Sequence, residues 1–149
     1  MVLKNGNDSD VSFVINGIKE ICKIEKQKPE SNAGLLKAVK EAIKGGRLIV
    51  ARLGNNRVGF VQFIFSTREP YGLDYGKRKK FCWIEWMYVT RFYRRHGVGR
   101  YMHQKIVALC KKKNVGEIML DVFRVNRSAI SFYRKENFKS FIHILVGKV

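Results

Sequence analysis

The spacing of hydrophobic positions predicts a short strand over residues 2–4 and then two helices. One of the polar residues 8–10 would cap the first helix, and Ser31 or Asn32 would cap the second, which ends at the glycines 45–46. In each helix the apolar residues recur with a period that fits one buried face. The positions expected to face the core are Val14, Ile15, Ile18, Ile21 and Cys22 in the first helix and Leu35, Leu36, Val39, Ala42 and Ile43 in the second.

The period then changes to one that is typical of strands. The β-rich runs 47–52 and 58–65 are joined by Gly54-Asn55-Asn56, which predicts a hairpin. The run 81–89 has aromatic residues on both faces and is therefore expected to be a central strand. Between these strands, residues 67–80 contain glycines, a proline and several basic residues and are interpreted as an exposed loop.

After the central strand the helical period returns. Apolar residues recur every four positions at Val98, Met102, Ile106 and Cys110. A strand over 115–122, a short helix over 126–136 and one or two closing strands over 138–146 complete the expected order. The strand, helix and strand from 81 to 122 form a β-α-β unit, so these two strands should be parallel. Since the hairpin makes the sheet mixed, the predicted class is α+β with three α/β/α layers, and residues 1–149 are expected to form one domain.

Composition restricts the function classes. The formal net charge of +18, from 30 basic and 12 acidic residues, favours anionic partners such as nucleic acid, ribosomes or a phosphate-rich cofactor. The three cysteines are widely spaced and indicate neither a disulfide framework nor a metal site. No run reaches the ~18 apolar residues that a membrane span needs. The first residues lack the pattern of a secretory signal, so we expect a soluble cytoplasmic protein.

The stretch Arg94-Arg95-His96-Gly97-Val98-Gly99-Arg100 follows the central strand and leads directly into a helix. Glycines allow the backbone to approach a ligand closely, and the first N–H groups of a helix lack internal partners. Together with the positive end of the helix dipole, they would bind a diphosphate, to which flanking arginines add hydrogen bonds. The alternative is a glycine-rich turn whose arginines face solvent.

This loop resembles the signature of the GNAT superfamily of N-acetyltransferases. The signature is arginine or glutamine, two residues, glycine, one residue, then glycine or alanine, and Arg94, Gly97 and Gly99 fill it. The preceding Met87-Tyr88-Val89 resembles the end of the family's fourth strand.

A second stretch is similar to the family's other signature. Asn126 stands at the expected helix start, Ala129 follows, and Phe132-Tyr133 precedes the pair Asn137-Phe138. The family usually has glycine where Asn137 stands, a mild departure because asparagine tolerates left-handed backbone angles.

The resemblance implies a bent mixed sheet whose fourth and fifth strands splay apart around acetyl-coenzyme A (acetyl-CoA). The residues expected to contact this cofactor are Met87, Tyr88, Val89, Arg94, Arg95, His96, Gly97, Val98, Gly99, Arg100, Asn126 and Ala129.

Amide formation needs a proton acceptor for the amine and a donor for the leaving thiolate. The family places a catalytic tyrosine where Tyr133 stands, so Tyr133 is the candidate general acid; the alternative is a packed ring with a solvated hydroxyl. Glu85 is the candidate base, since it is the one acid in an otherwise apolar and aromatic strand. Its alternative is an ion pair with an arginine. Asp121, on the neighbouring strand, is a weaker candidate, and a free N–H near Tyr88 or Val89 would stabilise the oxyanion.

The sequence says less about the substrate that accepts the acetyl group. Residues 18–26 and Ile84-Glu85 resemble segments of diamine acetyltransferases, but Trp86 replaces the second acid usual in that group. A small primary amine is the first expectation, and a protein N-terminus or lysine is the alternative. A nucleic-acid-binding module without catalysis and a non-catalytic acyl-CoA sensor are readings from other classes. Homodimers are frequent in the resembling family, and a homodimer is left open.

Overall fold

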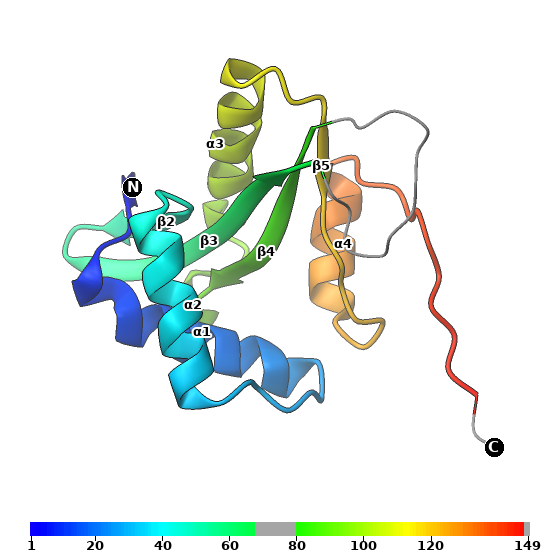
Figure 1. Ribbon diagram of the computed structural model, residues 1–149, viewed down its shortest axis with the longest axis horizontal. Coiled ribbons are helices and arrows are strands. Elements are labelled where there is room, and N and C mark those ends of the chain that lie inside the picture. The colour runs from blue at the N-terminus through cyan, green and yellow to red at the C-terminus, as the bar shows by residue number, and fades with distance from the viewer. Residues whose placement is uncertain (68–79, 148–149) are drawn as a thin grey trace.

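The computed structural model describes residues 1–67 and 80–147. Of the exposed loop predicted over 67–80, residues 68–79 lie outside this description. Figure 1 shows the elements in chain order. They are β1 (Val2–Asn5), a 3₁₀ turn (Asp8–Asp10), α1 (Val11–Ile24), α2 (Asn32–Lys44), β2 (Leu48–Leu53), β3 (Asn56–Ser66), β4 (Phe81–Val89), a second 3₁₀ turn (Arg91–Tyr93), α3 (Val98–Lys112), β5 (Glu117–Met119) and α4 (Arg127–Lys135).

The five strands form one mixed sheet in the order β1-β2-β3-β4-β5. Neighbours from β1 to β4 are antiparallel, whereas β4 and β5, which α3 connects, are parallel. This confirms the predicted hairpin, the central position of β4 and the β-α-β unit. A β-bulge lies in β4, because Gln62 pairs with Trp86 but the next residue, Phe63, pairs with Ile84. Glu85 is therefore the extra residue at the bulge.

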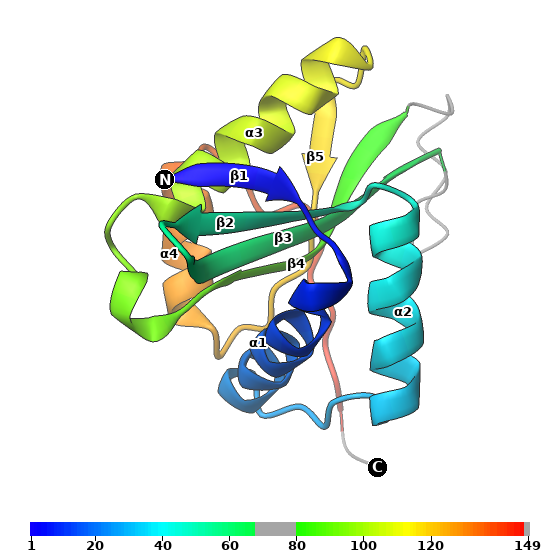
Figure 2. The same ribbon diagram turned by 90° about the vertical axis from the view of Figure 1, so that its left-hand side faces the viewer.

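Helices cover both faces of the sheet, which confirms the predicted α+β class with three layers. Figure 2 shows α3 on one face and α1 and α2 on the other. On the α3 face the helix stripe Met102, Ile106 and Cys110 is buried against strand residues such as Val61 and Ile84. The core on the other face contains Val14, Ile18, Val39, Phe60 and Tyr88.

The starts of α1 and α2 differ. A side-chain cap begins α2, whereas the residue at the N-cap position of α1 forms an ion pair instead. The Ser31 hydroxyl accepts the N–H of Gly34 at 3.1 Å, as predicted for the start of α2. Asp10 occupies the N-cap position of α1, but its side chain does not cap the helix. Its buried carboxylate instead accepts hydrogen bonds from Arg52 and from Arg57 Nε, the latter at 2.6 Å.

The structure departs from the predictions at the end of the chain. Strand β5 covers only Glu117–Met119, less than the predicted 115–122, because its pairing with β4 ends at Met119, opposite Trp83. The closing strands predicted over 138–146 are wrong: the described residues 138–147 form no strand and lead away from α4 (Figure 1). Leu145 and Val146 are about nine-tenths exposed, at 90% and 93%, so their β propensity finds no neighbouring strand to pair with.

Two negative observations apply to residues 1–67 and 80–147. No helix in these ranges is both long and apolar enough to cross a membrane. Nor do three histidine, cysteine, aspartate or glutamate side chains gather there as a metal site would need.

Candidate active site

The centre of the candidate site is an opening between β4 and β5. Their pairing ends at Trp83 and Met119, although β4 continues to Val89. The N–H of Thr90 donates to Val58 O of β3 at 3.0 Å. Because successive peptide groups of a strand point to opposite sides, those of Val89 and Met87 point away from β3, toward the opening. Val89 and Met87, rather than Tyr88, therefore present N–H groups there.

The loop before α3 presents backbone donors beside this opening. Gly97, at the N-cap position, has a φ of 81°, and a Cβ built there would meet no atom within 4 Å. The first helical hydrogen bond runs from Tyr101 N–H to Gly97 O. The N–H groups of Val98, Gly99 and Arg100 thus lie in the first turn, where an α-helix offers no internal acceptor. Donors in this arrangement fit a diphosphate.

The arginine side chains of this loop have protein partners. Arg94 Nε donates to Val89 O at 2.9 Å, and Arg94 Nη2 lies 3.3 Å from Glu20 Oε1. The Tyr88 hydroxyl also donates to Glu20, so Arg94 fastens the loop to the end of β4 and to α1. Arg100 Nε donates to Glu136 Oε1 at 2.8 Å, although its side chain is 60% exposed.

The remaining loop residues keep exposed side chains. Arg95 has a φ of 67°, in the left-handed region, and is exposed. His96 Nδ1 lies 2.7 Å from Arg94 O, so the His96 ring makes a contact within the turn itself. The backbone of Arg94–Arg100 is therefore the part of the loop that can bind a ligand. The side chains of Arg94 and Arg100 are paired with Glu20 and Glu136.

Helix α4 lies beside β5 (Figure 1) and packs against the start of α3. Gly99 allows its close approach to α3, because a Cβ there would lie 3.3 Å from the Phe132 ring. Asn126 Oδ1 accepts the Ala129 N–H at 3.2 Å, so Asn126 caps α4 as expected. Its Nδ2 donates to Glu25 Oε1 at 3.0 Å and thereby joins α4 to the end of α1.

Tyr133 lies on α4 between two aromatic neighbours. Its ring centroid is 5.1 Å from that of Phe132 and 5.3 Å from that of Phe138. Burial raises the pKa of the Tyr133 hydroxyl well above its usual value, and the nearby negative charges of Glu25 and Asp121 add to the rise. The hydroxyl consequently keeps its proton at neutral pH.

Glu85 points to the face of α1 and α2. Its Oε2 accepts a hydrogen bond from Gln62 Nε2 at 3.1 Å and lies 3.6 Å from Arg47 Nη1. The side chain is 31% exposed. Thus the ion pair that was the alternative for Glu85 is present, together with a contact to Gln62.

A cavity of about 230 Å³ adjoins this region, between α1, α2 and the sheet. Its walls include Ile18, Glu25, Leu35, Gln62, Trp86 and Phe123. Cys22 also lines it, but burial, together with the charge of Glu25, raises the pKa of the thiol, so Cys22 is a poor nucleophile.

A second, wider hollow of about 580 Å³ is lined by Arg127, Ile130, Ser131, Arg134 and Lys135. All five residues belong to α4, so this hollow is one basic face of a helix and not a cavity between elements.

Sequence reasoning missed Glu25 and Gln62. Glu25 stands in a lysine-rich run at the end of α1 and resembles a surface acid, yet only 9% of it is exposed. The signal available for Glu25 was the resemblance of segment 18–26 to diamine acetyltransferases. Gln62 belongs to no motif, and its importance depends on cross-strand pairing with Trp86.

Comparisons with known proteins agree with this geometry. A sequence model of the acetyltransferase (GNAT) family matches residues 17–138. A possible acetyltransferase from Clostridium difficile 630 is 20% identical over 99% of this chain and 96% of its own, with a TM-score of 0.76. A predicted acetyltransferase from Clostridium acetobutylicum, solved with acetyl-CoA, is 18% identical over 99% and 95%, with a TM-score of 0.75.

An aminoglycoside 6'-N-acetyltransferase from Acinetobacter haemolyticus is also similar. It is 14% identical over 100% of this chain and 98% of its own, and the TM-score is 0.74. At these identities the likeness of the solved structures concerns the fold.

Proposed function

Since this chain belongs to the GNAT acetyltransferase family and is an acetyl-CoA-dependent N-acetyltransferase, we propose that its acceptor is the primary amine of a small molecule. The observation that carries the proposal is a cavity of about 230 Å³ lined by Glu25, whose carboxylate is joined through Asn126 to the helix that carries Tyr133. Bound acetyl-CoA supplies an activated acetyl thioester to this opening.

We propose that backbone groups hold the cofactor. The first-turn N–H groups of α3, with those of Arg95 and His96, bind its diphosphate, and the absence of a side chain at Gly97 keeps the approach open. Arg94 acts by fixing the loop through Val89 O and Glu20. The basic charge of Arg100 adds long-range attraction for phosphate, because its side chain is 60% exposed even while it is paired.

Further contacts lie deeper in the opening. The N–H groups of Met87 and Val89 would donate to the acetyl oxygen, in the manner of an oxyanion hole. Ala129 and Asn126, at the start of α4, would border the pantetheine arm. Val98 is buried and contributes its N–H alone, since its side chain packs in the core.

We propose that Tyr133 is the general acid. Its hydroxyl is protonated at neutral pH and can therefore act as a donor to the leaving sulfur, although burial makes it a weaker acid than a free tyrosine. The assignment of Glu85 as base stays a prediction, because its carboxylate already contacts Gln62 and Arg47. The direct test of the function is to incubate the protein with acetyl-CoA and separate groups of small amines, amino acids and peptides. Free thiol released only with small amines supports the proposal, whereas release only with peptides contradicts it.

The broader expectations are kept as proposals. Residues 1–149 would act as one domain in the cytoplasm, and the +18 charge would favour association with nucleic acid or ribosomes. A homodimer stays a prediction. The reading as a nucleic-acid-binding module without catalysis is not retained, because the chain belongs to an acetyltransferase family.

A further inference from the structure

Gln62 has a side-chain oxygen that has no hydrogen-bond partner among the described residues. The side chain lines the cavity between α1, α2 and the sheet, and the residue is only 4% exposed. A carboxylate accepts hydrogen bonds and donates none, so Nε2 must be the amide atom that faces Glu85. The other amide atom, Oε1, is buried and has no hydrogen-bond partner among the described residues. A buried acceptor without a partner is unfavourable, and a ligand N–H would remove that penalty.

Glu25 gives the same cavity a negative charge. One carboxylate oxygen accepts the Asn126 amide, and a carboxylate retains capacity for further donors. The charge of Glu25 raises the pKa of both Cys22, in the cavity, and Tyr133, at the opening. Glu25 therefore lines the cavity and is also tied to Asn126, at the start of the helix that carries Tyr133.

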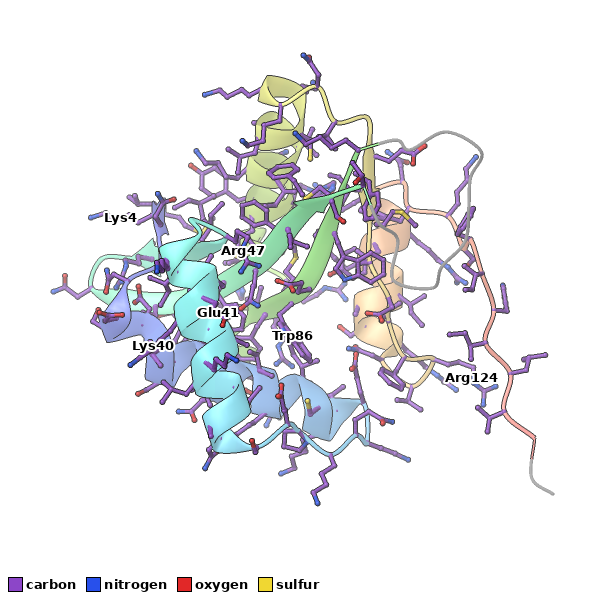
Figure 3. The ribbon with its side chains drawn as sticks, viewed as in Figure 1. Lys4, Lys40, Glu41, Arg47, Trp86 and Arg124 are labelled. Atoms are coloured by element: carbon purple, nitrogen blue, oxygen red, sulfur yellow. The ribbon has the colours of Figure 1, made fainter. Side chains whose placement is uncertain are left out.

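Trp86 also lines the cavity. It pairs directly with Gln62 across the strands, and the bulge at Glu85 directs it to the face of α1 and α2. Figure 3 shows Trp86 between the sheet and α1. The face of a tryptophan ring attracts a cation, especially where water is excluded. An acceptor oxygen, a carboxylate and an indole ring in one cavity match the chemistry of an alkylammonium group.

The size and the apolar walls restrict the rest of the ligand. Ile18 and Leu35 line the cavity with hydrocarbon, whereas Lys28 and Glu30, which also line it, carry opposite charges. A volume of about 230 Å³ is below the 300–1,000 Å³ that is typical of sites for drug-sized ligands. A protein with a net charge of +18 also repels polycations more than monocations at long range. A short monoamine with an apolar body satisfies all three conditions.

We propose that this cavity is the acceptor site, that it selects small primary monoamines, and that Glu25 and Gln62 Oε1 bind the ammonium group. The hydrogen bond from Gln62 Nε2 to Glu85 fixes the orientation of the amide and turns Oε1 away from the Glu85 carboxylate. The inference rests on the proposed acetyl transfer for its biological meaning, but ammonium binding is measurable without turnover.

The test is a calorimetric titration of the protein with butylamine, hexylamine and 2-phenylethylamine, with and without saturating coenzyme A. Glu25→Gln and Gln62→Met should each weaken amine binding by about tenfold or more, as expected for a hydrogen bond to a charged group. Glu41→Gln is the matched control, since it changes the net charge equally on the exposed surface of α2, as Figure 3 shows. It should leave amine binding unchanged.

A third variant examines the cavity without altering a polar group. Ala38 lines the cavity, so Ala38→Leu should exclude hexylamine more strongly than butylamine. Equal affinity of the wild type, Glu25→Gln and Gln62→Met would overturn the proposal. So would tighter binding of spermidine or of a lysine-containing peptide than of the monoamines.

Thermal stabilisation by coenzyme A distinguishes a failure of this inference from a failure of the proposed function. Stabilisation of every variant by coenzyme A against heat, with amine binding lost only in the cavity variants, supports both. Amine binding that depends on Glu25 and Gln62, in a protein that coenzyme A does not stabilise, supports the cavity and contradicts acetyl transfer. Coenzyme A stabilisation without binding of any monoamine overturns the cavity proposal alone.

Discussion

Asn126 Nδ2 donates to Glu25 Oε1 over 3.0 Å, and this contact joins residues that are 101 positions apart. The same Asn126 side chain caps α4 through its oxygen, which accepts the Ala129 N–H. One amide therefore sets the start of the helix that carries Tyr133 and also fixes the carboxylate beside the cavity. Asn126 therefore couples the position of Tyr133, the candidate acid, to that of Glu25, which is proposed to bind the ammonium group.

Asn126→Ala should reduce both stability and activity. Loss of the helix cap lowers the free energy of unfolding by about 1 kcal/mol, and Glu25 loses its partner. We expect kcat/KM to fall about tenfold or more, as for loss of a hydrogen bond to a charged group. Ser31→Ala is the matched control, because Ser31 caps α2 in the same way without a contact to Glu25. Urea unfolding should show a loss of stability in both variants, larger in Asn126→Ala because Glu25 also loses its donor, and thiol release should show a loss of activity in Asn126→Ala only.

Tyr133→Phe should lower kcat by roughly 10²–10⁴-fold if proton donation limits the rate. Because the pKa of Tyr133 is raised, the wild-type rate should show no loss of this acid through the neutral range. Tyr101→Phe, on the exposed side of α3, serves as the control and should retain activity. Thiol release across pH 6–9, a range around neutrality, measures both; full activity of Tyr133→Phe would leave Tyr133 as a packing residue.

Gly97→Ala should weaken the binding of coenzyme A. At a φ of 81° an alanine costs about 1–2 kcal/mol in backbone strain, and its methyl group would point into the space expected for the diphosphate. Gly54→Ala imposes similar strain, at a φ of 57° and with nothing within 4 Å, in the turn before β3. Thermal unfolding should show that both variants are destabilised and that coenzyme A rescues Gly54→Ala alone. Equal rescue would contradict the assignment of the loop.

Much of the fold could be predicted because local patterns and long-range packing agree. The stripe Val98, Met102, Ile106 and Cys110 predicts α3 and is buried in the structure. Strand β4 was predicted at its full length, Phe81–Val89, from its run of aromatic and β-branched residues. The closing strands over 138–146 failed since β propensity forms a strand only where a partner exists.

The site was less accessible to sequence reasoning. The glycine loop consists of residues that are adjacent in the sequence, so Gly97 and Gly99 could be identified from their spacing. Glu25 and Gln62 become notable only through tertiary contacts: the first with Asn126 and the second with Glu85. Likewise, no pattern indicates that Arg94 and Arg100 turn to Glu20 and Glu136.

Asp10 should be the most sensitive acid for stability outside the site. Burial alone would raise its pKa, but hydrogen bonds from Arg57 and Asn7 N–H and the charge of Arg52 lower the pKa below the usual 3.8. Asp10→Asn leaves both arginines without their counter-charge, and breaking a buried ion pair costs roughly 3–5 kcal/mol. Since both guanidinium groups are partly exposed, we expect a value near the lower end, measured by urea unfolding at pH 7.

The dependence of unfolding free energy on pH distinguishes loss of the Asp10 ion pair from a simple packing defect, which would not change with pH. A carboxylate with a lowered folded pKa contributes its stability above pH 3.8 and loses it as the pH falls through the folded value. The gap in unfolding free energy between the wild type and Asp10→Asn should therefore be constant at neutral pH and shrink below pH 3.8. Asp8→Asn, an exposed neighbour, should show almost no gap at any pH. A gap for Asp10→Asn that persists unchanged in acid would mean that shape, and not the ion pair, makes Asp10 necessary.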